Sequence, residues 1–105
     1  MSNVEASKKM KSTNYNLTSQ KINRKTEILR EEIDEEVLLF NPKTRKTYVL
    51  NQMADVIWEL CDGKHTPAGI TDEIVDVLEV NSDQVRKDVL KVIEDFFDQN
   101  LVDVS

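Results

Sequence analysis

The chain has 105 residues, a formal net charge of −6 and a single cysteine, Cys61. This length suits one domain with one hydrophobic core, and a lone cysteine excludes an internal disulfide. No apolar run approaches the roughly 20 residues that span a bilayer, and no signal peptide is apparent. We therefore expect a cytoplasmic protein that does not associate with membranes.

The charge is unevenly distributed along the chain. Residues 1–25 hold six basic residues and one acidic residue, a net charge of +5, whereas residues 26–105 hold eight basic and 19 acidic residues, a net charge of −11. An acidic body repels the phosphates of nucleic acids. We therefore expect no nucleic acid among the partners.

The first segment is polar, rich in Ser, Asn, Thr and Lys, and has no sustained hydrophobic period. Such a composition is typical of disordered segments. The sequence predicts a disordered basic arm over residues 1–23 and a folded domain over residues 24–105.

The folded part begins with a β pattern. Strands are expected within residues 26–33, 36–40 and 46–50, with Asp34-Glu35 as a tight hairpin turn. The apolar run at residues 37–40 predicts a central strand that is covered on both faces.

Beyond residue 50 the hydrophobic period becomes helical. Asn51 is a good N-cap for a first helix, which Gly63 would stop, and Thr66-Pro67 and residues 81–85 begin two further helices. The fold class is therefore α+β: a three-stranded antiparallel sheet followed by a three-helix bundle, in a winged-helix-like arrangement.

The third helix carries more apolar surface than one core face requires. Its main apolar arc spans about 100°, and a separate shoulder holds Leu90 and Phe97, with Arg86 on the same flank. Two interpretations remain open. The shoulder packs under the sheet or the C-terminal segment, or it lines an open groove.

The residue inventory offers little catalytic chemistry. His65 is the only histidine and lies between helices, and Cys61 falls on the apolar side of a helix, as a buried thiol would. Gly63 and Gly69 are the only glycines, which excludes a glycine-rich phosphate loop. The sequence has no histidine and cysteine cluster for a metal. We expect no enzyme activity, no metal and no cofactor.

An ordered set of residues resembles the PqqD family and its wider class, the RiPP recognition elements. These elements bind the leaders of ribosomally synthesised, post-translationally modified peptides. The similarity extends over residues 26–104, and residues 35–51 look like the family's β-hairpin region. It is carried by Leu50-Asn51, Ala54, Ile57-Trp58, Asp62-Gly63, Thr66, Ile70, Asp88-Val89, Val92-Ile93 and Asn100-Leu101-Val102.

The resemblance implies a non-catalytic accessory protein. Its relatives bind the leader of a precursor peptide as an added strand between strand three and helix three, and present it to a modifying enzyme, often a radical-SAM enzyme. We expect a monomer rather than a dimer. The expected peptide-binding residues are Arg45, Lys46, Thr47, Tyr48, Val49, Arg86, Leu90, Ile93 and Phe97. Of these, Ile93 fits a place in the core better than a place in the groove.

Two other functions remain as alternatives. The first is a winged-helix DNA-binding regulator, although the third helix carries more acidic than basic residues. The second is a structural or dimerising subunit that binds only folded proteins, through an unpaired sheet edge.

Overall fold

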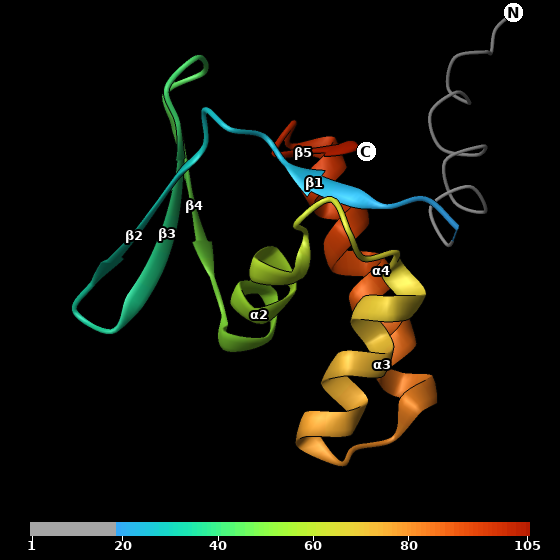
Figure 1. Cartoon of the computed structure of the whole chain (residues 1–105). Coiled ribbons are helices and arrows are strands. Elements are labelled where there is room, and N and C mark those ends of the chain that lie inside the picture. Colours follow the sequence, from blue (N-terminus) through green and yellow to red (C-terminus); the bar gives the residue numbers. More distant parts are fainter. Residues whose placement is uncertain (1–18) are drawn as a thin grey trace, which may run out of the picture.

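The computed structural model describes residues 19–105 (Figure 1). Residues 1–18 of the expected arm lie outside this part. The last two residues of that arm, Ile22 and Asn23, belong instead to strand β1, Ile22–Arg24. Because Ile22 has no exposed surface, the folded domain begins before residue 24.

The expected three-stranded antiparallel sheet is confirmed. It contains β2 (Leu29–Ile33), β3 (Glu36–Asn41) and β4 (Lys46–Leu50), in the order β2-β3-β4. Asp34 and Glu35 form the first turn with φ values of 51° and 70°, the left-handed pair that two-residue hairpins favour. The sheet therefore consists of two successive hairpins (Figure 1).

The two faces of this sheet differ in burial. On the face toward the helices, Leu39 of β3 is fully buried. On the other face, Leu38 and Phe40 are only half-buried, and their cross-strand neighbours Val49 and Leu29 are 64% and 51% exposed. The expectation that β3 is covered on both faces is wrong, because all three helices lie to one side of the sheet (Figure 1).

The three helices begin where the sequence predicts. They are α2 (Gln52–Leu60), α3 (Pro67–Leu78) and α4 (Ser82–Asp98). Each N-cap side chain accepts a hydrogen bond from the backbone N–H three residues later in the chain. The distances are 2.8 Å for Asn51, 3.1 Å for Thr66 and 3.0 Å for Asn81. Each cap satisfies one of the N–H groups left without a partner at a helix start.

A short terminal ribbon, which the sequence did not predict, closes the domain. β1 pairs antiparallel with β5 (Val102–Val104). Asn100 ends α4 in the left-handed conformation, with φ 61°, as its side chain allows. The chain then places Leu101 and Val102 in the core beside Ile22, so both ends of the domain are held by the same hydrophobic cluster.

The core is centred on the contact between α2 and α4. The rings of Trp58 and Phe96 meet edge to face, with centroids 5.5 Å apart and planes at 83°, a favourable aromatic geometry. Trp58 therefore braces α2 against α4.

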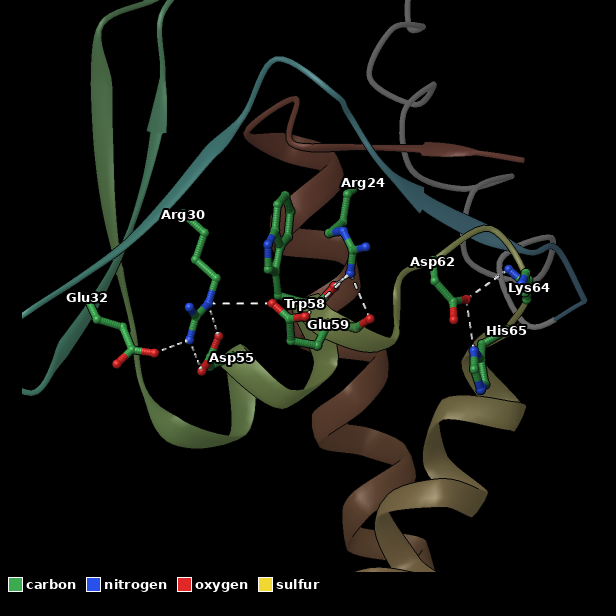
Figure 2. Close-up of polar contacts among 9 residues, drawn as sticks. All are labelled: Arg24, Arg30, Glu32, Asp55, Trp58, Glu59, Asp62, Lys64 and His65. Atoms are coloured by element: carbon green, nitrogen blue, oxygen red, sulfur yellow. Dashed lines mark hydrogen bonds and ion pairs between the residues drawn. The ribbon is translucent and has the colours of Figure 1, made fainter.

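Two arginines tie the β elements to α2 (Figure 2). Arg30 of β2 donates to both carboxylate oxygens of Asp55, each at 2.8 Å, and to Glu32 at 2.9 Å. These hydrogen bonds raise the pKa of Arg30. Arg24 of β1 donates hydrogen bonds to the backbone oxygens of Trp58 and Glu59, at 3.1 and 2.7 Å. Both carbonyls belong to the last turn of α2, and that of Trp58 also accepts from Cys61 N–H.

The loop before α3 is organised around His65. Its Nδ1 lies 2.9 Å from Asp62 Oδ1, and its Nε2 lies 3.4 Å from Glu73 Oε2. The bond to Asp62, with a smaller contribution from Glu73, raises the pKa of His65 despite partial desolvation. The backbone oxygen of His65 accepts from Ile22 N–H at 3.0 Å, which joins this loop to β1.

Stability should therefore decrease as the pH rises through neutrality. A histidine whose folded-state pKa exceeds its unfolded value of about 6.5 stabilises the fold fully below that value, and the effect is lost as pH rises through the folded pKa. We expect the melting temperature to fall as the pH rises above about 6.5, the unfolded value. His65→Gln should flatten this dependence, and an equally steep decrease in the variant would contradict the assignment.

Candidate functional site

A cleft of about 430 Å³ separates β4 from α4. It lies between the third strand of the main sheet and the third helix, where the sequence analysis placed the binding site. Its lining residues come from β4, α2, α4 and the segment before β5: Thr47, Tyr48, Val49, Leu50, Asn51, Ala54, Val92, Asp95, Phe96, Gln99 and Leu101.

The strand wall of the cleft is a free sheet edge. In the order β2-β3-β4, one side of β4 has no neighbouring strand among residues 19–105. The strand contains no proline, and Val49 is 64% exposed. An unpaired edge offers backbone N–H and C=O groups to an incoming strand, so this wall is suited to pair with an extended peptide.

The helix wall is one stripe of α4. Asp95, Phe96 and the C-cap residue Gln99 come three, four and seven residues after Val92, which places all four on one side of a helix. Phe96 is almost fully buried and Val92 is half-buried, whereas Asp95 and Gln99 are exposed. The wall thus has an apolar base and a polar rim.

The strand residues expected from the sequence lie at this cleft. Thr47, Tyr48 and Val49 line it directly. Arg45 and Lys46 are exposed at the start of β4 and do not line it. Arg45 has a φ of 65° in the turn between β3 and β4, so both basic side chains are at one end of the strand wall.

The helix residues expected from the sequence lie elsewhere. Ile93 has no exposed surface and belongs to the core. The sequence pattern allowed Ile93 a place in either the groove or the core. Arg86 pairs with Asp83 at 3.2 Å. Leu90 and Phe97 are half-buried and do not line the cleft.

Helix geometry explains this difference. At about 100° per residue, Leu90 and Phe97 are roughly 160° and 140° around the α4 axis from Val92. The buried Ile93 lies between these two sides. The core face of α4 therefore has two flanks, and the strand edge meets the flank that holds Asp95 and Gln99, neither of which is among the binding residues expected from the sequence.

The lining of the cleft contains no His, Cys, Lys or Arg. Burial raises the pKa of the Cys61 thiol to about 12, and this side chain has no exposed surface. Residues 19–105 contain no group of three His, Cys, Asp or Glu side chains placed to hold a metal. Over the same range, no helix combines the length and apolar character needed to cross a membrane.

Sequence comparison identifies the family. Residues 36–102 match the family model of coenzyme PQQ synthesis protein D, PqqD. The chain belongs to the PqqD family. This confirms the resemblance noted from the sequence, and members of this family are non-catalytic binding proteins. No curated protein has a matching sequence.

Two solved structures share the PqqD-family fold seen here. The first is described as lasso peptide synthetase B1 complexed with the leader peptide, with a TM-score of 0.68 and 17% identity over 78% of this chain and 96% of that one. The second is TbiB1 in complex with the TbiA(beta) leader peptide, with a TM-score of 0.67 and 22% identity over 77% of this chain and 94% of that one. The expected α+β arrangement is confirmed by these matches.

The burial of Cys61 predicts a thiol that is inert in the folded protein. Only the thiolate reacts with disulfide reagents, so a thiol with a pKa of about 12 and no exposed surface should be labelled only through unfolding. We expect almost no reaction with an aromatic disulfide reagent at pH 8 in buffer and complete reaction in denaturant. Rapid labelling of the native protein would contradict this environment.

Proposed function

We propose that this protein binds the leader segment of a ribosomally made precursor peptide in the cleft between β4 and α4. The observation that carries the proposal is the free edge of β4 facing a partly apolar stripe of α4. The fold that presents this cleft is shared with two proteins whose structures contain leader peptides.

The proposed binding mode is strand addition. Backbone groups along the edge of β4 hold the leader by hydrogen bonds, which gives affinity with little dependence on sequence. Alternate leader side chains then point into the cleft, because side chains along a strand alternate between its faces. Val92 and Phe96 form the apolar surface against which those side chains pack.

The proposed role is presentation rather than catalysis. A leader held along β4 leaves the remainder of the precursor free for a separate modifying enzyme, which the family resemblance suggests is often a radical-SAM enzyme. We also propose that the protein acts as a monomer, since pairing of β4 with a second copy would occupy the same edge.

Substitution of Val92 by Glu tests this proposal. A carboxylate on the helix wall places a charge against the leader, where desolvation is unfavourable. We expect Val92→Glu to weaken binding of a candidate leader peptide at least about tenfold, equivalent to about 1.4 kcal/mol, in a fluorescence-anisotropy titration.

A matched control is available on α3. Val77 is 75% exposed and lies outside the cleft, so Val77→Glu should leave both leader affinity and melting temperature nearly unchanged. Equal binding by the wild type and Val92→Glu would reject the cleft. Binding of duplex DNA but of no leader would favour the DNA-binding alternative.

A further inference from the structure

One carboxylate stands out within the cleft. Asp95 is the only acidic side chain among the lining residues, and no lining residue is basic. Its carboxylate makes no hydrogen bond or ion pair with any side chain in the described part of the chain, and it is exposed. By contrast, Asp88 earlier on α4 accepts a hydrogen bond from the side chain of Gln84 at 3.0 Å.

A bound strand would change the environment of this carboxylate. Asp95 is exposed on the rim above Val92 and Phe96, and a peptide laid along β4 would exclude water from the space between the two walls. A charged group that loses water without gaining a partner is strongly destabilising. A leader that covers Asp95 avoids this cost by supplying a hydrogen-bond donor at this position, and a cation gives the strongest pairing.

We infer that the leader recognised by this protein carries a Lys or Arg whose side chain pairs with Asp95. This inference rests on the proposed leader-binding function and specifies the substrate of the same cleft. The wider charge distribution favours it, because residues 26–105 carry a net charge of −11 and attract cationic peptides at long range.

The spacing of the helix wall also defines the position of this basic residue. Val92 and Gln99 lie about one helical turn from Asp95 on either side, a rise of roughly 5 Å. Same-face residues of a strand are about 7 Å apart. For a leader strand that runs along the α4 axis, the side chain that packs on Val92 and the one that pairs with Asp95 are two positions apart. This spacing gives an apolar residue, any residue and then a basic residue, in one chain direction or the other.

A peptide-display selection tests this inference. The probe is a library of random 12-residue peptides displayed on yeast, sorted for binding to the full chain. Separate sorts use the wild type, Asp95→Asn, Asp95→Lys and a matched control, Asp98→Asn, whose carboxylate is exposed on α4 but does not line the cleft. Only peptides that bind the wild type but not Val92→Glu are compared. This criterion restricts the comparison to peptides that occupy the cleft.

The expected result is a charge preference that follows residue 95. Sorts with the wild type and with Asp98→Asn should enrich peptides that carry Lys or Arg two positions from an apolar residue. Sorts with Asp95→Asn should lose the preference for Lys or Arg and keep the preference for the apolar residue. Sorts with Asp95→Lys should enrich Asp or Glu at the same position. Replacing the enriched basic residue by Glu should weaken binding to wild type about tenfold or more and to Asp95→Asn by less than about twofold.

Two contrary results are distinguishable. Peptides that bind the cleft with an apolar pattern but no basic preference would overturn the pairing with Asp95 and leave the proposed function intact. A selection that yields no cleft-dependent peptide would overturn the proposed function and this inference with it.

Discussion

The packing of Trp58 against Phe96 is the contact on which the binding cleft depends. Trp58 belongs to α2, which follows β4 after the single residue Asn51, and Phe96 belongs to α4 and lines the cleft. The edge-to-face contact at 5.5 Å therefore fixes α2, through its last turn, relative to α4. Because β4 runs directly into α2, the same contact sets the distance between the strand wall and the helix wall.

The rest of the fold stabilises this arrangement. Arg30 joins the main sheet to α2 through both oxygens of Asp55, and Arg24 joins the terminal ribbon to the other end of the same helix. These arginines are partly exposed, so each ion pair alone contributes little. Their effect is geometric, since the successive strands β1 and β2 are both joined to the short helix α2, which lies 25 to 35 residues further along the chain.

Local signals in the sequence were sufficient to predict most elements. The side chains of Asn51, Thr66 and Asn81 cap helices because each can accept from an N–H nearby in sequence, and Asp34-Glu35 turns the chain because both residues adopt left-handed conformations. Such features depend on a few adjacent residues. The family and the position of the cleft between the third strand and the third helix could also be predicted. Both follow from the order of strands, turns and helix caps along the chain.

Long-range contacts were the part that could not be predicted. β1 and β5 are three residues each and pair across the whole domain, so neither shows a periodic pattern of its own. On α4, apolar residues flank the core face on one side, at Leu90 and Phe97, whereas the cleft uses the other side with Asp95 and Gln99. Hydrophobicity alone favoured the first flank, and only the path of β4 determines which flank meets the strand edge.

Intermolecular NOEs in an NMR spectrum of the isotope-labelled protein with an unlabelled leader peptide would test the central claim most directly. Strand addition predicts contacts between the peptide backbone and the backbone of residues 46–50, together with side-chain contacts to Val92 and Phe96. Contacts confined to the opposite flank of α4, at Leu90 and Phe97, or to the exposed outer face of the sheet, would contradict the account.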